Sequence, residues 1–131
     1  MQIPLIICSM VSGIILFQSV LIAPAINKLI DQKQASILLR YLWPKFFFSI
    51  GSLLMISFVS SLIYRYDQLL TKYSSGLSFV LMSICYFIVP IINNAKDASK
   101  NRLWSNLHLT TVFLTLITLI LSISTIYFSN F

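Results

Sequence analysis

Residues 103–131 read LWSNLHLTTVFLTLITLILSISTIYFSNF and contain no aspartate, glutamate, lysine or arginine. A helix rises about 1.5 Å per residue, so roughly 20 apolar residues cross the hydrocarbon core of a bilayer, which is about 30 Å thick. Backbone groups in hydrocarbon must pair internally, and an unbroken run of this length favours a helix over the short alternating strands of a membrane barrel. The stretch therefore predicts a transmembrane helix over about 103–127.

Three more stretches of the chain are free of charge: 1–27, 46–64 and 73–95. The nine basic and three acidic side chains all lie in the connections between these stretches, within 28–45, 65–72 and 96–102. A chain of 131 residues that is 58% hydrophobic has no room for a soluble domain beside four spans. We predict one membrane domain over 1–131, an all-α four-helix bundle with spans at about 3–27, 46–64, 73–95 and 103–127.

The basic residues also predict the orientation. The first and third connections share one side of the membrane, and they carry more lysine and arginine than the second connection does. The positive-inside rule then predicts that connections 28–45 and 96–102 are cytoplasmic. Both termini are expected outside, on the periplasmic side of a bacterial inner membrane. The net charge of +6 is thus a topology signal rather than a sign of nucleic-acid binding. We expect no nucleic-acid partner.

The first span has one alternative interpretation, because Ala23-Pro24-Ala25 has the form of a signal-peptide cleavage site. No lysine or arginine precedes it, and the apolar run is about twice as long as a usual signal core. We therefore expect the span to be retained.

The first connection contains a further helical pattern. Asp31 and Gln34 resemble a capping pair, and apolar residues then recur at helical spacing until Pro44. This pattern predicts a short interfacial helix between spans one and two, ended by Pro44, with Tyr41 and Trp43 at headgroup level. Its apolar positions are Ala35, Leu38, Leu39 and Leu42.

The chain contains an internal repeat. Residues 22–27, IAPAIN, end the first span, and residues 88–93, IVPIIN, end the third, with Ile, Pro, Ile and Asn in matching positions. Each copy is followed by a basic connection and by an Arg-to-Trp segment, 40–43 or 102–104. The repeat predicts two tandem antiparallel hairpins related by a pseudo-two-fold axis along the membrane normal. Alternatively, proline and asparagine only mark helix exits. The four repeat positions are Pro24, Asn27, Pro90 and Asn93.

The last span carries a polar seam, a row of residues spaced alternately by three and four, which places them on one helix face. Small hydroxyl residues allow helices in lipid to approach closely and to bond to one another, so the seam is interpreted as the packed inner face of the bundle. The alternative is a polar path or pocket along the axis, to which Gln18, the mid-span amide, would contribute. The seam consists of His108, Thr111, Thr115, Thr118, Ser122, Thr125 and Ser129.

The spans contain no acidic residue, and the chain has no Gly-rich phosphate loop, CxxC, HExxH or Ser-His-Asp set. We therefore expect no enzymatic activity, no catalytic residue, no cofactor and no metal site. The only candidates for a soft metal such as cuprous copper are weak ones: Met55, Met82, Cys85 and His108. A single histidine cannot supply both axial ligands of a haem.

Taken together, several of these residues resemble a family of small four-span proteins, mostly bacterial and of unknown function, that is grouped with eukaryotic transmembrane protein 205. In that family's pattern a Ser and then an Asn follow the histidine, whereas Thr111 and Thr115 stand here. The resemblance implies the fold and the membrane location. Through the eukaryotic relatives' association with platinum drugs and secretion, it also hints at traffic of metals or small solutes. The matching elements are Gly13, Ala23-Pro24, Ala35, Arg40, Trp43-Pro44, Phe46-Phe47, Pro90 and Leu107-His108.

The sequence thus favours a non-enzymatic scaffolding or accessory subunit of a membrane assembly, with the lipid bilayer, a second copy or larger subunits as partners. The first alternative is a protein that transports or binds a small solute or soft metal along the seam. The second alternative is a haem or quinone redox subunit.

Overall fold

The computed structural model describes residues 3–63 and 69–130, and apart from the short connections at 30–31 and 98–100 these residues are helical. The chain order is α1 (Ile3–Phe17), the π-helical turn η1 (Gln18–Ile22), α2 (Ala23–Leu29), α3 (Gln32–Ile63), α4 (Leu69–Asp97) and α5 (Asn101–Asn130). The first three elements follow one another as a single rod. The structure therefore has four long helical rods, each long and apolar enough to cross a membrane. The prediction of an all-α four-helix bundle is confirmed.

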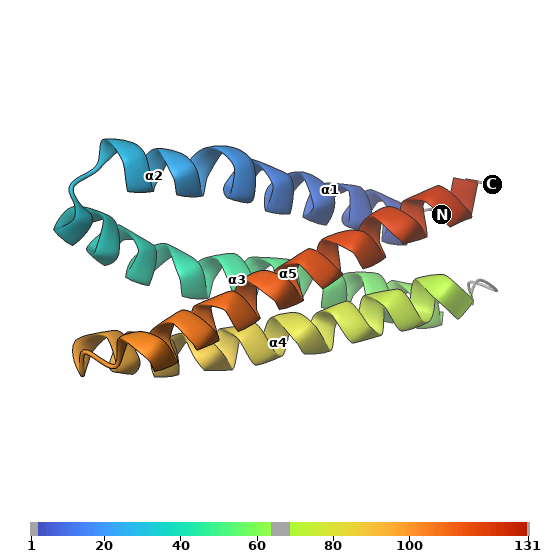
Figure 1. Ribbon diagram of the computed structural model, residues 1–131. Helices are drawn as coiled ribbons and strands as arrows, with labels where there is room; N and C mark the ends of the chain where they lie inside the picture. Colours follow the sequence, from blue (N-terminus) through green and yellow to red (C-terminus); the bar gives the residue numbers. More distant parts are fainter. Residues whose placement is uncertain (1–2, 64–68, 131) are drawn as a thin grey trace.

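The rods alternate in direction (Figure 1). Both chain ends lie at one end of the bundle, and the α2–α3 and α4–α5 connections lie at the other. We call the latter the basic end; there, Arg40 of α3 donates two hydrogen bonds to the carboxylate of Asp97 at the end of α4. Around the bundle the rods follow the order α1, α3, α4, α5, with each packed against its neighbours in this order. A two-fold axis along the bundle, exchanging one hairpin with the other, gives the same order.

The burial pattern of α5 is the reverse of that in a water-soluble helix. Its buried residues carry hydroxyl groups, as Thr118 and Ser122 do, whereas large apolar side chains such as Phe113, Leu116 and Ile120 are exposed. An exposed apolar surface on all sides is favourable only when the medium is hydrocarbon. The chain is therefore an integral membrane protein. The apolar core comes from the other three rods: Ile7, Val11, Ile15, Phe47, Ile50, Leu54, Met82, Cys85 and Val89.

The prediction that Pro44 ends a separate interfacial helix is wrong. The helix that begins just after Asp31 continues through Pro44 to Ile63, so the predicted interfacial segment is the first part of α3. Proline removes one backbone donor, a loss that membrane helices tolerate when neighbouring packing holds the turn. Here the Trp43 ring stacks on Phe47, with centroids 5.7 Å apart, and meets the edge of Phe46. These contacts span the proline and keep both sides in one helix.

The two proline exits of the repeat differ in backbone geometry. Pro90 lies inside the continuous helix α4, whereas Pro24 follows the π-helical turn η1. In that turn the Ala23 N–H donates to the Gln18 carbonyl, five residues back instead of four. A proline ring collides with the carbonyl four residues before it, and a wider turn at that point makes room for the ring. The first rod is therefore interrupted where its counterpart α4 is not.

The α4–α5 turn closes with Ser99 in the left-handed backbone region, at a φ of 58°. The Lys100 N–H donates to the Ala95 carbonyl at 2.9 Å, and the Ser99 N–H donates to Lys96 at 3.1 Å. This is the Schellman arrangement that satisfies the last carbonyls of a helix, and it normally places glycine at the left-handed position.

Replacing Ser99 by glycine should therefore stabilise the protein, by about 0.5–1 kcal/mol, because glycine adopts this conformation without a Cβ clash. The matched control is Ser105→Gly on the exposed face of α5, which should destabilise by about 0.5 kcal/mol. Unfolding in detergent micelles, followed by circular dichroism, measures both. Equal shifts in the same direction would contradict the turn geometry.

Candidate functional site

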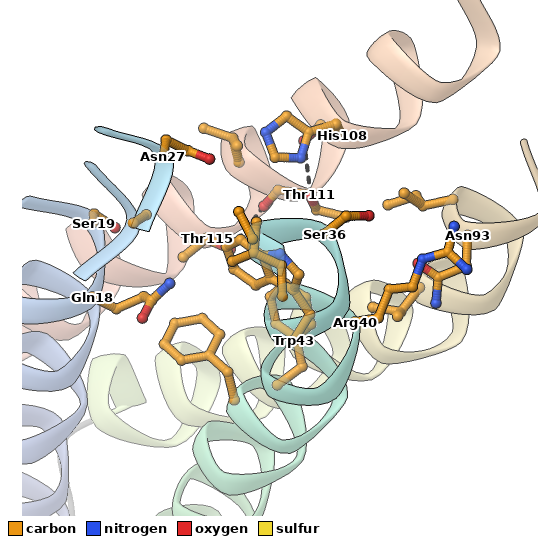
Figure 2. A pocket seen from close by; sticks show the side chains of 18 of the residues that line it. Gln18, Ser19, Asn27, Ser36, Arg40, Trp43, Asn93, His108, Thr111 and Thr115 are labelled. Carbon is orange, nitrogen blue, oxygen red and sulfur yellow. Dashed lines mark hydrogen bonds between the residues drawn. The ribbon is translucent and has the colours of Figure 1, made fainter. Parts of the chain in front are cut away.

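A cavity of about 840 Å³ lies between the two hairpins at the basic end of the bundle. We call it the inter-hairpin cavity. It is bounded by the end of α1 with η1 and α2, by the first part of α3, by the last turns of α4 and by the first half of α5. Figure 2 shows many of its side chains. The polar ones are Gln18, Ser19, Asn27, Gln32, Ser36, Arg40, Asn93, Lys96, His108, Thr111 and Thr115.

The cavity lies where the first rod and α5 diverge. The α1 and α5 helices lie side by side toward the chain ends, and α2 diverges from α5 toward the basic end (Figure 1). There α2 makes its contacts with η1 and α3. On the opposite side, the uninterrupted α4 packs along both α3 and α5. The space thus opens on the side of the first hairpin, beside the π-helical turn.

Equivalent residues of the repeat meet around this cavity. Asn27 and Asn93 both line it, and so do Trp43 and Trp104 from the segments that follow the two basic connections. In Figure 2 Asn27 and Asn93 lie on opposite sides of the cavity, with Trp43 between them. The two prolines of the repeat, Pro24 and Pro90, are exposed and are not part of the lining. If proline and asparagine only marked helix exits, the two asparagines would not need to line one cavity. Their convergence therefore supports the interpretation of a repeat built around a shared site.

His108 is held between the two tryptophans. Its ring stacks on Trp104, with centroids 5.5 Å apart and planes 5° from parallel, and it meets Trp43 edge-on at 6.4 Å. The chain contains no other tryptophan. No side-chain hydrogen bond in the described part of the chain uses the His108 ring nitrogens, so the aromatic contacts set the ring's orientation.

The polar seam divides into two parts. Toward the basic end, His108, Thr111 and Thr115 line the cavity. Farther along α5, Thr118, Ser122 and Thr125 are buried and belong to no part of the lining. The side chain of Ser129, the last member of the seam, lies outside the described residues.

The buried part of the seam packs against α4. Thr125 donates to the Ser74 hydroxyl at 2.8 Å, and Ser74 donates to the Leu121 carbonyl at 3.1 Å. Other hydroxyls turn back to their own helix, as Thr118 does to the Leu114 carbonyl at 3.0 Å. These are the close approach and interhelical bonding expected of a packed face. The Oγ atoms of Ser12, Ser78 and Ser122 are buried without a partner among the described residues.

The soft-ligand candidates do not come together. Met82 and Cys85 are buried in the core, Met55 is 44% exposed on the outer surface, and His108 lines the cavity. In the described part of the chain, no three His, Cys, Asp or Glu side chains gather as a metal site requires. The arrangement can accommodate a molecule among aromatic, amide and basic groups, rather than bind an ion through several ligands.

Four residues of the cavity that the sequence analysis assigned to no site are Arg40, Trp43, Lys96 and Trp104. Trp43 was interpreted as an interface anchor, Trp104 only as the end of a repeat segment, and Arg40 and Lys96 as topology signals. The repeat itself could have identified the tryptophans, because it places each of them one connection after an asparagine that does line the cavity.

Comparison with protein-family models, curated proteins and solved structures finds no match for this chain. The resemblance to the family of transmembrane protein 205 accordingly stays a prediction.

The packed part of the seam makes a prediction. Thr125→Val removes the hydroxyl that bonds to Ser74 and should lower the free energy of unfolding by about 0.6 kcal/mol, the average for such bonds in membrane proteins. Thr110→Val is the control, because Thr110 is exposed and donates only to the Asn106 carbonyl of its own helix. Unfolding in mixed micelles should separate the two variants. A control as destabilised as Thr125→Val would argue against the interhelical bond.

Proposed function

We propose that this protein is a non-enzymatic membrane protein that binds one small amphiphilic molecule in the inter-hairpin cavity. The observation that supports this function most strongly is the convergence of both copies of the repeat on one cavity. Asn27, Asn93, Trp43 and Trp104 line the same space, and His108 is fixed between the tryptophans. Membrane proteins built from repeats commonly bind their ligands where the repeats meet.

The size and lining of the cavity favour an amphiphile as its occupant. Apolar residues line much of this space, so a molecule with an apolar part fits it. Its volume of about 840 Å³ lies within the usual range of small-molecule sites, roughly 300–1,000 Å³. A buried water needs two to four polar partners, which apolar lining residues such as Ile15 and Leu119 do not offer. Gln18, Asn27 and Asn93 offer amide groups to a polar head.

Binding is better supported than conduction. A conduit would continue from the cavity along Thr118, Ser122 and Thr125 toward the opposite end of the bundle. These three residues are instead buried in helix contacts outside the cavity lining. The spans also lack the acidic residues from which cation sites and carboxylate proton relays are built.

The location of the site follows from the predicted orientation. With the basic end on the cytoplasmic side of a bacterial inner membrane, the cavity belongs to the cytoplasmic leaflet. Arg40 and Lys96 then lie at headgroup level, and the apolar lining lies in hydrocarbon.

A role as an accessory subunit is the second candidate. One exposed surface favours it: Phe48 of α3 meets Tyr86 of α4 at 6.2 Å, and Tyr86 meets Phe87 at 5.6 Å. Aromatic clusters of this kind are enriched in protein interfaces. Native mass spectrometry from lipid nanodiscs tests this role, with a stable oligomer or co-purifying subunit that is lost in Phe87→Ala as the expected result. A monomer alone would exclude it.

The two tryptophans allow a direct test of the binding function, because all tryptophan fluorescence of the chain comes from the cavity. Protein in maltoside micelles is titrated with phosphatidylcholine or phosphatidylglycerol carrying dibrominated acyl chains, which quench tryptophan on contact. At least one lipid should quench saturably at a low mole fraction.

The matched pair of variants for this test is Thr115→Phe and Thr110→Phe. Both threonines lie on α5 and bond back to their own helix, but only Thr115 lines the cavity. Thr115→Phe should fill the space and reduce the lipid affinity about tenfold, equivalent to 1.4 kcal/mol, while Thr110→Phe should leave it unchanged. Quenching that rises linearly with every lipid, and equally in both variants, would refute a bound amphiphile.

A further inference from the structure

We infer that the occupant of the inter-hairpin cavity is an anionic phospholipid of the surrounding leaflet, with its phosphate at Lys96 and one acyl chain between α1 and α5. This inference rests on the proposed function and specifies its ligand. Three features of the structure lead to it: the unbalanced charge at the mouth, a basic groove that adjoins the mouth, and an opening toward lipid.

The charge of the lining is positive, and only one of its two cations is neutralised. The lining contains Arg40 and Lys96 and no acidic residue. Arg40 is neutralised by Asp97, which does not belong to the lining. The Lys96 ammonium lies 5.4 Å from the centre of the Trp104 ring, and no ion pair of Lys96 with a carboxylate is found among the described residues. One cation at the mouth therefore remains available for an anionic group.

A shallow groove continues from the mouth along the surface of the basic end. It shares Arg40 and Lys96 with the cavity and adds a second lysine, Lys33, and the carboxylate of Asp97. The cavity with its apolar lining and the groove with its cations thus adjoin at Arg40 and Lys96. A phospholipid has the same division, with its chains in the apolar part and its head among the cations.

The apolar part of the cavity is open to the membrane. Leu16 of α1 and Val112 and Leu116 of α5 line it and are also 45%, 49% and 50% exposed. Residues exposed at this depth face lipid, so the cavity opens laterally between α1 and α5. An acyl chain can enter there from the same leaflet without crossing water. A phospholipid of that leaflet already has its headgroup at the level of the groove.

The asparagines suit the polar part of such a lipid. The side chains of Asn27 and Asn93 take part in no hydrogen bond to another described residue, and both line the cavity. Their amide N–H groups can donate to phosphate and ester oxygens. A phosphate near Lys96 gains a charge-assisted bond, which is stronger than a neutral one.

Quenching by dibrominated phosphatidylglycerol and dibrominated phosphatidylcholine, measured side by side, tests the inference. The two lipids share their chains and differ in net charge. Half-maximal quenching should need about fivefold less phosphatidylglycerol than phosphatidylcholine, the effect expected of one lysine at a membrane surface. Lys96→Gln should abolish this difference. Lys96→Arg, which retains the charge, should preserve it and controls for loss of folding.

Lys100→Gln is the matched control. Lys100 lies four residues after Lys96, in the α4–α5 turn, and lines neither the cavity nor the groove. It should keep the preference for phosphatidylglycerol. If Lys100→Gln and Lys96→Gln lost the preference for phosphatidylglycerol equally, the preference would come from the general surface charge. That result would overturn the inference.

Failure of the inference and failure of the proposed function give different results. Equal, saturable quenching by both lipids that Thr115→Phe weakens would overturn the anionic head while leaving the amphiphile site in place. Linear quenching by both lipids, unaffected by Thr115→Phe, would overturn both.

Discussion

The whole structure depends on one constraint: in hydrocarbon, backbone groups must be hydrogen-bonded within the chain, and charges must be kept out. The first requirement makes every span a helix. The second confines the nine basic and three acidic side chains to three segments, 28–45, 65–72 and 96–102. Small hydroxyl residues can still be buried beside the apolar core, and the buried face of α5 carries Thr118, Ser122 and Thr125 while its outer face is apolar.

The candidate site arises where the two hairpins cease to be equivalent. Both copies of the repeat place a proline and an asparagine near the basic end, but only the first copy is interrupted by a π-helical turn. Such turns are often found at functional sites, and here the turn lies beside the cavity, on the rod that diverges from α5. The symmetric part of the repeat supplies paired asparagines and tryptophans. The asymmetric part supplies the space between them.

Much of the fold could be predicted because charge and hydropathy are local properties of the sequence. The four helical rods and the shared end of the first and third connections required only the positions of the charged residues. The continuity of α3 could not be predicted in this way, because it depends on Trp43 stacking against Phe47 across Pro44. Sequence rules treat a proline as a stop, whereas the surrounding packing decides whether the helix ends.

The site was less predictable than the fold. Spacing places His108, Thr111, Thr115 and Thr118 on one face of a helix, but it does not indicate that the cavity ends between Thr115 and Thr118. That boundary depends on where a neighbouring rod diverges, which is a property of the three-dimensional packing. Lys96 and Arg40 have the same sequence signature as any cytoplasmic cation. Only the three-dimensional arrangement distinguishes Arg40, which Asp97 neutralises, from Lys96, which lies over Trp104 at the mouth.

The central claim is that a space between the hairpins holds a molecule from the membrane. A high-resolution density map of the protein in nanodiscs made from a native lipid extract tests it most directly. The account predicts elongated density between α1 and α5 that reaches Trp43 and Trp104 and ends in a head beside Lys96. A map in which protein side chains close this space, with α2 packed against α5, would contradict it.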